Sequence, residues 1–181
     1  MTLEFNIMRS LKLIDSLPQD AVYFQMDSPV ERLTLMGSSQ GLHAVLWDCD
    51  FQNPKYINLL AQLKKNNNLE IFLKAEKQLT EYFLGQRKKF DLDLVLYGTA
   101  FQKQAWAELS KIPYGQTISY GEQAGNMGDT NKARAVGMAN GQNPLSIIIP
   151  CHRVIGANGK LTGFGGGLDK KEFLLGLERC F

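Results

Sequence analysis

Three short stretches near the start of the chain have the hydrophobic pattern of β-strands. Residues 21–27 and 43–47 are rich in apolar and aromatic side chains. Residues 31–36 alternate polar with apolar side chains, as a half-buried strand does. The connections at residues 28–29 (Ser-Pro) and 37–41 are short and have the composition of turns. The pattern therefore predicts an antiparallel meander of three strands.

The pattern then changes to a helical spacing. A helix is predicted over residues 53–65, although residues 64–68 are polar and typical of a turn. Residues 69–85 carry apolar side chains at helical spacing and end at a glycine, which favours a helix stop. Residues 90–96 alternate again and predict a strand that leads into a linker. We place the boundary between two structural units near residues 88–98.

Good helix caps recur in the second unit. Thr99 and Ser119 are suitable N-caps for two helices, and Thr130 or Asn131 is suitable for a third that ends near residue 140. Two short helices joined by a glycine-containing turn form a helix-turn-helix, and its second helix, residues 131–140, is expected to face DNA. The fold class expected is therefore α/β in the N-terminal domain and mostly α in the C-terminal domain.

The stretch that follows this motif carries the candidate chemistry. The isoleucines at residues 147–149 predict a short buried strand, which Pro150 ends because proline cannot continue a sheet ladder. The chain then presents Cys151 and His152 together, and a thiol beside an imidazole is a candidate nucleophile with its base. A buried structural cysteine is the alternative. A last helix, residues 170–178 with Asp169 as its cap, ends at Glu178, a candidate to orient His152.

Composition excludes several classes of protein. Of the 181 residues, 44% are hydrophobic and 21% are charged, as in ordinary globular proteins. No apolar run is long enough to span a bilayer, and Glu4 interrupts the start, so we expect no membrane partner, no signal peptide and a cytoplasmic location. Three cysteines at long spacings argue against a disulfide framework and a four-ligand zinc site. Asp48 and Asp50 lack a third acidic partner, so we expect no metal there, and His43 is expected to be an ordinary strand residue.

Charge alone does not identify a partner, because the net charge is only +2. Residues 111–160, however, contain five basic and two acidic side chains. Within the predicted third helix, Ala133, Gly137 and Gly141 repeat at i, i+4 and i+8, so the helix surface has low relief. Arg134 is the long charged side chain in this patch, and it could enter a groove or a base stack; tight packing against another helix is the alternative.

The motifs together resemble one family, the methylated-DNA–protein-cysteine methyltransferases, which repair O6-alkylguanine in DNA. The resemblance is carried by residues 134–137 (RAVG), 141–144 (GQNP) and 149–154 (IPCHRV). It continues with residues 163–164 (GF), 166–167 (GG), 171–172 (KE) and 174–175 (LL). It extends in order from about residue 101 to residue 178. It implies a ribonuclease H-like N-terminal domain over residues 1–90, and a winged-helix-like DNA-binding and alkyl-acceptor domain over residues 91–181.

The resemblance also implies catalytic roles. Cys151 is the acceptor thiolate that attacks the alkyl carbon, His152 is the base that acts through a water molecule, and Glu178 orients His152. Asn143 braces the turn that carries the site. Tyr120 helps to rotate the nucleotide and donates a hydrogen bond to the leaving guanine.

Further residues of the family pattern are expected to bind DNA or the base. Arg134 replaces the extruded base in the stack, which offsets part of the cost of flipping the nucleotide out. The other residues expected to contact DNA are Ala133, Ala135 and Gly137, and those expected to line the substrate pocket are Val154, Gly163, Phe164, Gly165 and Lys171. The expected partner is double-stranded DNA that contains O6-alkylguanine, and also O4-alkylthymine. The protein is expected to act as a monomer, with no cofactor and no metal, and each molecule reacts once.

Two departures from the family pattern concern the substrate range. Phe164 stands where many members have tyrosine, so one pocket hydroxyl is missing, and Gly165 stands where members carry serine or arginine. Two other functions remain open at this point: a cysteine hydrolase that uses Cys151 and His152, and an alkyltransferase-like DNA binder that transfers nothing. The first predicts turnover, and proteins of the second kind lack the acceptor cysteine.

Overall fold

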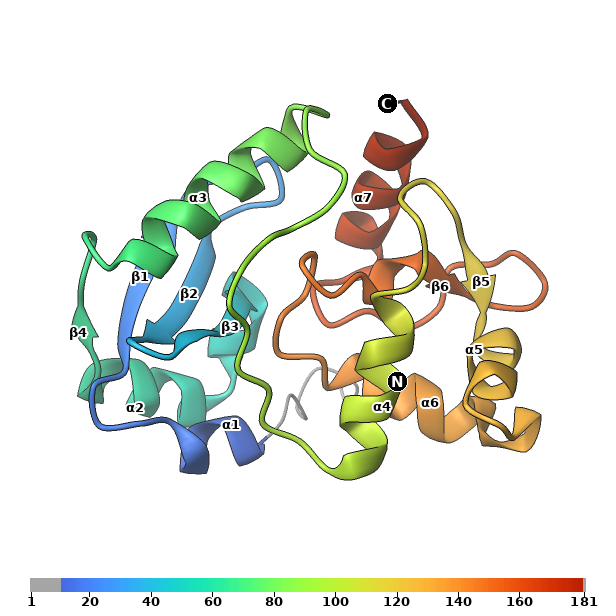
Figure 1. Cartoon of the computed structure of the whole chain (residues 1–181), viewed down its shortest axis with the longest axis horizontal. Coiled ribbons are helices and arrows are strands. Elements are labelled where there is room, and N and C mark those ends of the chain that lie inside the picture. The colour runs from blue at the N-terminus through green and yellow to red at the C-terminus, as the bar shows by residue number, and fades with distance from the viewer. Residues whose placement is uncertain (1–10, 181) are drawn as a thin grey trace.

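A four-stranded sheet organises the first half of the computed structural model, which describes residues 11–180 (Figure 1). The strands are β1 (Val22–Met26), β2 (Leu33–Ser38), β3 (Gly41–Trp47) and β4 (Lys64–Lys65). The first three form the predicted antiparallel meander, and β4 pairs with β1 in parallel, which gives the order β3-β2-β1-β4. The sequence had predicted only a turn at β4. Residues 1–10, including Glu4, lie outside the described part of the chain.

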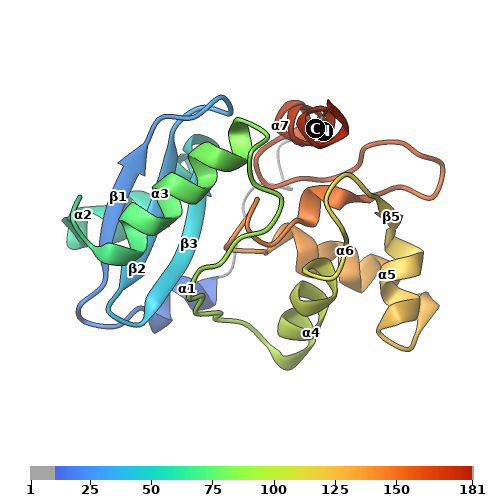
Figure 2. The ribbon, with the colours of Figure 1, turned by 45° about the horizontal axis from the view of Figure 1, so that its top comes forward.

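Helices cover both faces of this sheet. They are α1 (Leu11–Ser16), α2 (Pro54–Gln62) and α3 (Glu70–Phe83). The short 3-10 helix η2 (Asp48–Gln52) connects β3 to α2. In both ribbon views α3 lies across one face of the sheet (Figures 1 and 2). Leu33 and Leu35 join the core cluster of Phe72 on α3, whereas Met36 joins that of Tyr56 on α2. All of β2 is therefore buried, and the prediction that one face of this strand is exposed is wrong.

The predicted strand at residues 90–96 is also wrong. The segment is extended but makes one bridge, in which Leu42 N–H donates to the Asp93 carbonyl at 2.8 Å and Val95 N–H donates to the Leu42 carbonyl at 2.9 Å. The next part of the β3 edge is already occupied, because Val45 N–H donates to the carbonyl of Pro144 at 2.8 Å. The linker and the second half of the chain thus share the edge of β3, which leaves less of it open to pairing with other chains.

The second half is mostly helical. Its elements are α4 (Ala100–Leu109), β5 (Ile118–Ser119), α5 (Tyr120–Asn126), η3 (Thr130–Lys132), α6 (Ala133–Gly141), η4 (Cys151–Arg153), β6 (Val154–Ile155) and α7 (Leu168–Cys180). Thr99 and Ser119 cap α4 and α5 as predicted. The third cap was predicted wrongly: Asp129, and not Thr130 or Asn131, accepts a backbone N–H at the start of η3. Within residues 11–180, no helix combines the length and the apolar character that crossing a membrane requires.

The last helix also differs from its prediction. It begins at Leu168, so Asp169 lies inside its first turn and does not precede it. Leu174 and Leu175 on this helix are buried, whereas Phe173 is 40% exposed. Helix α7 lies close to the C-terminal end of α3 in both ribbon views, where the two halves of the chain meet (Figures 1 and 2).

One hydrophobic cluster extends through both halves. It contains Phe72 and Leu79 of α3 from the first half. From the second half it contains Trp106 of α4, Leu174 of α7, and Leu145, which precedes the cysteine turn. Burial of apolar side chains from both sides removes water from the junction. The site residues near this junction are therefore supported by both halves of the chain.

The helix-turn-helix has a polar tie in its core. The buried side chains of Gln123 on α5 and Asn140 on α6 bond to each other through both amides, at 3.2 and 2.7 Å. The Gln123 amide also donates to the carbonyl of Ala105 on α4 at 3.0 Å. Three helices are thus tied together by one pair of side chains.

Asn140→Ala should lower the free energy of unfolding by about 1–3 kcal/mol, because it leaves the buried amide of Gln123 with unpaired groups. The measurement is urea-induced unfolding of the wild-type and variant proteins. Asn126→Ala, which changes an exposed asparagine on α5, is the matched control and should have little effect. Equal stabilities of the two variants would contradict a structural role for the pair.

Candidate active site

The cysteine is carried by a buried turn and not by the strand predicted at residues 147–149. Ile149 N–H donates to the Leu145 carbonyl at 2.8 Å, and Ile147 lies between them with a positive φ of 74°. A β-branched residue rarely adopts this conformation, so the surroundings must hold it there. Asn143 does part of this, because its amide donates to the Ile149 carbonyl at 2.8 Å and its side-chain oxygen accepts Leu145 N–H at 3.0 Å.

After Pro150 the chain makes one 3-10 turn, η4, which places three functional side chains in the interior. Cys151 is 6% exposed, His152 is fully buried and Arg153 is 6% exposed. Because they are consecutive in a tight turn, their side chains leave the backbone in different directions. The thiol lies near Tyr120 and Lys171, whereas the imidazole and the guanidinium point to Glu178 on α7.

The carboxylate of Glu178 is the centre of the polar network. His152 Nε2 donates to Oε1 at 2.8 Å, and Arg153 donates from Nη2 to Oε1 and from Nε to Oε2, both at 2.9 Å. The Tyr82 hydroxyl donates to Oε1 at 2.8 Å, and the Gly115 backbone N–H donates to Oε2 at 3.0 Å. A carboxylate has about four lone-pair positions, so five donors saturate it.

These contacts determine the charge of the carboxylate and the tautomer of the imidazole. Burial alone would raise the pKa of Glu178, but the hydrogen bonds and charges of His152 and Arg153 hold that pKa well below its usual range. Since an ionised carboxylate only accepts hydrogen bonds, His152 Nε2 must carry the proton. In the neutral ring Nδ1 is then unprotonated, and it is buried with no hydrogen-bond partner among residues 11–180. Burial lowers the pKa of His152, so the ring is neutral and able to accept a proton at Nδ1.

Lys171 supports the same region from α7. Its buried Nζ donates to the Val154 carbonyl at 2.7 Å and to the Thr162 carbonyl at 2.8 Å, and the Tyr120 hydroxyl also donates to Thr162 at 3.2 Å. Burial lowers the pKa of Lys171 to about 8, and a negative charge at Cys151 would oppose this shift. Lys171 therefore ties β6 to the start of the glycine-rich loop and places a positive charge near the thiol.

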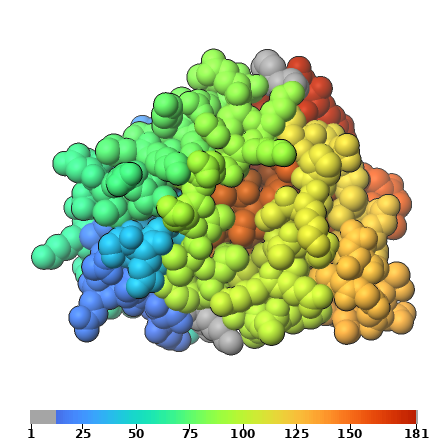
Figure 3. All heavy atoms as spheres, viewed as in Figure 1, coloured from blue at the N-terminus to red at the C-terminus, as the bar shows by residue number. Residues whose placement is uncertain are grey.

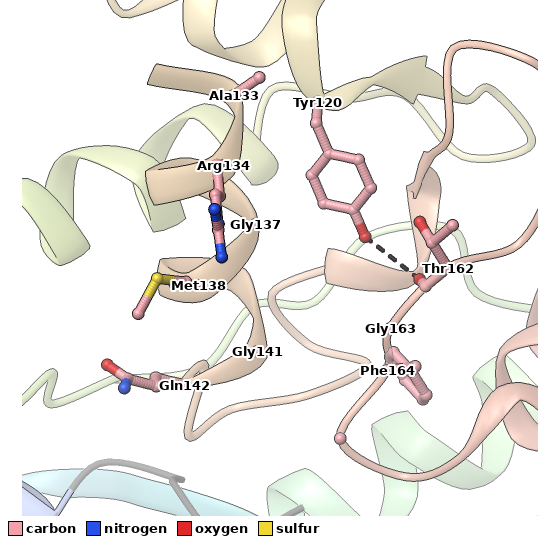
Figure 4. Close-up of a pocket in the computed structure, with 11 residues that line it drawn as sticks. Tyr120, Ala133, Arg134, Gly137, Met138, Gly141, Gln142, Thr162, Gly163 and Phe164 are labelled. Carbon is pink, nitrogen blue, oxygen red and sulfur yellow. Dashed lines mark hydrogen bonds between the residues drawn. The ribbon is translucent and has the colours of Figure 1, made fainter. Parts of the chain in front are cut away.

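A cavity of about 790 Å³ lies between α6 and the loop at residues 162–165 (Figure 4). The side chains of Arg134 and Met138 lie on its α6 side, and Tyr120 and Phe164 lie across from them. The lining residues that were expected to bind DNA or base are Ala133, Arg134, Gly137, Tyr120, Gly163, Phe164 and Gly165. Gly141, from the predicted low-relief repeat, also lines the cavity, and the lining residues that no sequence pattern predicted are Met138, Gln142 and Thr162.

Three residues expected at the surface of this site lie elsewhere. Val154 and Lys171 are buried behind the wall that they were expected to line, and Ala135 is exposed on α6 but is not part of the cavity lining. Cys151 does not line the cavity either. In the space-filling view, deep-orange atoms, which by the colour bar belong to the chain near residue 150, are visible at the bottom of a hollow between the green and yellow segments (Figure 3).

The glycine-rich loop is seated on the N-terminal half. The ring of Phe164 meets Trp47 of β3 edge to face, with centroids 5.7 Å apart. A Cβ on Gly166 would lie 2.8 Å from the indole, so only glycine permits this approach. The Cys49 thiol donates to the Gly165 carbonyl at 3.4 Å. No pattern in the sequence connects Trp47 with this loop, because the two are far apart along the chain.

Asp48 and Asp50 lie in the 3-10 helix η2, and Asp50 accepts the backbone N–H of Trp47 at 2.8 Å. In the part of the chain that the structure describes, no three His, Cys, Asp or Glu residues come together as metal ligands would. Cys49, Cys151 and Cys180 form no disulfide within the described residues. His43 is a buried strand residue, as expected, with Nε2 2.8 Å from the Ser38 hydroxyl.

Comparison with protein families agrees with this architecture. The model described as the ribonuclease-like domain of 6-O-methylguanine DNA methyltransferase matches residues 21–96. The model described as the DNA binding domain of the same protein matches residues 100–180. Together with the sheet of the first half and the helices of the second, these matches confirm the predicted fold class.

Individual relatives are similar over most of their length. A methylated-DNA–protein-cysteine methyltransferase of Methanosarcina acetivorans is 47% identical over 163 residues, which cover 86% of this chain and 97% of the relative. The crystal structure of the Mycobacterium tuberculosis O6-methylguanine methyltransferase has a TM-score of 0.78 at 44% identity, with 88% of this chain and 93% of that chain covered. The M. tuberculosis OGT in complex with DNA has a TM-score of 0.72 at 42% identity, with 87% and 92% covered.

Glu178→Gln should destabilise the protein at neutral pH by about 3 kcal/mol, because it leaves Arg153 buried without its charged partner. A carboxyl whose pKa is lower in the folded state stabilises the fold above its unfolded pKa, near 4.5, and this contribution is lost as the pH falls towards the folded pKa. The difference between wild type and variant should therefore be constant from about pH 7 to about pH 5.5 and narrow below about pH 4.5.

Urea unfolding curves at several pH values measure this difference. Glu172→Gln, at an exposed position of the same helix, is the control and should show no comparable dependence. A difference between wild type and Glu178→Gln that stays the same down to about pH 3 would contradict the ionised, hydrogen-bonded carboxylate.

Proposed function

The chain belongs to the methylated-DNA–protein-cysteine methyltransferase family, and we propose that Cys151 is the residue that accepts the alkyl group. The function is DNA repair by direct reversal, in which the alkyl group leaves the base and the base remains in the DNA. The observation that carries the assignment to Cys151 is its position beside His152, whose Nε2 is held by Glu178. The Nδ1 of His152 is unprotonated and has no hydrogen-bond partner among residues 11–180.

The reaction balances without a cofactor. The thiol proton passes to His152 Nδ1 through a water molecule, and the sulfur attacks the carbon that is bonded to O6 of guanine. A sulfur–carbon bond forms, the carbon–oxygen bond breaks, and the guanine takes up one proton from water. His152 returns the thiol proton to water, so the net change moves one proton from the thiol to the guanine. The imidazolium that forms is stabilised by the negative charge of Glu178, as in other nucleophile–base–carboxylate arrangements.

Tyr120 and Lys171 serve the leaving base and the thiolate. Burial raises the pKa of Tyr120, so its phenol keeps its proton and remains a hydrogen-bond donor. Its hydroxyl, which donates to Thr162 in the free protein, turns to the oxygen of the leaving guanine. Lys171 lies on α7 close enough to Cys151 for the two groups to interact electrostatically.

Access to the thiol requires a flipped nucleotide. Cys151 is only 6% exposed, so an alkyl group on O6 of a base that is stacked inside a duplex cannot reach its sulfur. Arg134 is exposed on α6 at the edge of the cavity, and we assign to it the replacement of the extruded base in the stack. Met138 is 58% exposed one helical turn further on, where it adds apolar surface against the groove.

The finer parts of the function rest on the family resemblance. We propose O6-alkylguanine in double-stranded DNA as the main substrate and O4-alkylthymine as a second one, with the protein acting as a monomer in the cytoplasm. Phe164 has no hydroxyl to offer the base and Gly165 has no side chain, so recognition relies on backbone groups of the loop. A cysteine hydrolase is the competing function, and it would turn over many substrate molecules. Alkyl transfer to Cys151 gives a stable thioether, so each protein molecule reacts once.

Cys151→Ala should abolish alkyl transfer and leave DNA binding nearly unchanged, because the exposed contacts come from α6. Intact-mass measurement after incubation with a methylated duplex should show one added methyl group on the wild-type protein and none on the variant. Cys49→Ala and Cys180→Ala are the controls and should accept the group as the wild type does. Transfer by the Cys151→Ala protein would move the acceptor to another cysteine and overturn the assignment.

Arg134→Ala should slow repair of duplex DNA far more than reaction with the free base O6-benzylguanine. The free base needs no flipping, whereas an unfilled gap in the duplex lowers the flipped population by a factor of about 10². The measurement is the ratio of variant to wild-type rates on free base, single strand, mismatched duplex and paired duplex, at one salt concentration. The ratio should fall along that series.

Lys132→Ala separates this effect from a general loss of positive charge. It removes a neighbouring cation from η3, and it should weaken binding to paired and mismatched duplexes alike. If Arg134→Ala gave the same ratio on all four substrates, Arg134 would serve the fold or the pocket and not the stack.

A further inference from the structure

Tyr82 brings the N-terminal half of the chain into contact with the catalytic residues. It lies near the end of α3, is fully buried, and is separated from Glu178 by 96 residues along the chain. Its hydroxyl donates to Glu178 Oε1 at 2.8 Å and lies 3.5 Å from His152 Nε2. The same carboxylate oxygen therefore accepts hydrogen bonds from the catalytic imidazole and from a side chain of the other domain.

The ring of Tyr82 is held firmly in this position. It contacts Phe83 and Phe90 with centroid distances of 5.5 Å each, and Tyr114 with a distance of 6.1 Å. Burial and the charge of Glu178 raise the pKa of Tyr82, so the phenol remains protonated and always donates. A rigid ring with a permanent donor on Oε1 restricts the direction from which His152 Nε2 can approach the same oxygen.

We infer that Tyr82 is a positioning residue for alkyl transfer, through which α3 of the N-terminal domain sets the orientation and the proton affinity of His152. This inference rests on the proposed function, in which His152 accepts the thiol proton at Nδ1. The hydroxyl disperses part of the negative charge on Oε1, and this charge is what stabilises protonated His152. Removal of the hydroxyl leaves more charge for the imidazole, so the proton affinity of His152 rises and the orientation of its ring is less restricted.

Several other groups act on His152 and remain in place when Tyr82 is changed. They are Glu178 and Lys171 on α7 and Arg153 on η4, and Cys151 is the neighbour of His152 in the chain. The two buried charges nearest to it, Glu178 and Arg153, are already paired with each other. A change in the pH dependence of the Tyr82 variant can therefore be attributed to the lost hydroxyl.

The test is Tyr82→Phe, which keeps the ring contacts and removes only the hydroxyl. The alkylation rate near neutral pH should fall about fivefold, the size expected for one net hydrogen bond. The acid limb of the rate–pH profile should move to higher pH by about half a unit, because His152 becomes more basic. Since the effect is on the proton transfer, O6-benzylguanine and methylated duplex should show the same loss, unlike the pattern expected for Arg134→Ala.

Tyr114→Phe is the matched control. Tyr114 belongs to the same aromatic cluster, but its hydroxyl has no hydrogen-bond partner among residues 11–180. This variant should keep the wild-type rate and pH profile. Thermal unfolding of both variants separates a change in the site from a change in stability. If Tyr82→Phe had the rate and pH profile of Tyr114→Phe while Cys151 was still alkylated, the inference would be overturned and the proposed function would stand.

Nuclear magnetic resonance provides a readout that a merely structural role would not change. The chain has two histidines, so the ¹⁵N signals of His152 can be separated from those of His43. The pKa of His152 should be higher in Tyr82→Phe than in Tyr114→Phe. A measurement on the wild-type protein does not depend on the folding of a variant. There the Tyr82 hydroxyl proton should exchange slowly with water and lie close to the imidazole protons of His152. A rapidly exchanging hydroxyl proton, or an unchanged pKa of His152, would contradict the inference.

Discussion

The buried carboxylate of Glu178 is the interaction on which the rest of the structure depends. An ionised group in the interior is strongly unfavourable unless every lone pair is satisfied. Here the donors come from α3, from the turn after α4 and from η4, and α7 provides the acceptor. These elements can meet only in one arrangement if the charge is to be compensated. The same bonds select the tautomer of His152, so the requirement for stability also prepares the base for its reaction.

The N-terminal domain takes part in the active site without supplying a reacting atom. Tyr82 reaches the carboxylate from one side, and Trp47 supports the glycine-rich loop from another. One hydrophobic cluster runs beneath both contacts. A movement of one domain against the other would therefore disturb the base and the pocket wall together. This coupling gives a physical reason for the close junction between the N-terminal domain, which supplies no reacting atom, and the Cys-His turn.

Local sequence signals predicted much of the fold and failed in identifiable ways. Capping by Thr99 and Ser119 and the period of α3 were predicted correctly, because these features depend on residues within one or two turns. The exposure of residues 31–36 and the strands at residues 90–96 and 147–149 were predicted wrongly. In each case a distant segment decided the outcome: α2 covers the second face of β2, Pro144 occupies the edge of β3, and Asn143 bends the isoleucine stretch into a turn.

The sequence by itself determined the family, the presence of a thiol beside an imidazole, and the low-relief helix with its single arginine, because these are properties of residue type and spacing. Only the tertiary structure decided which nitrogen of His152 is protonated, that Arg153 and Tyr82 share its carboxylate, and that Val154 and Lys171 lie behind the pocket wall. Tyr82 and Glu178 are 96 residues apart, and no periodicity spans that distance. A buried charge must be surrounded by hydrogen-bond donors, and here these donors come from segments far apart in the sequence. Contacts of this kind are therefore a property of the packed chain and not of any one stretch of it.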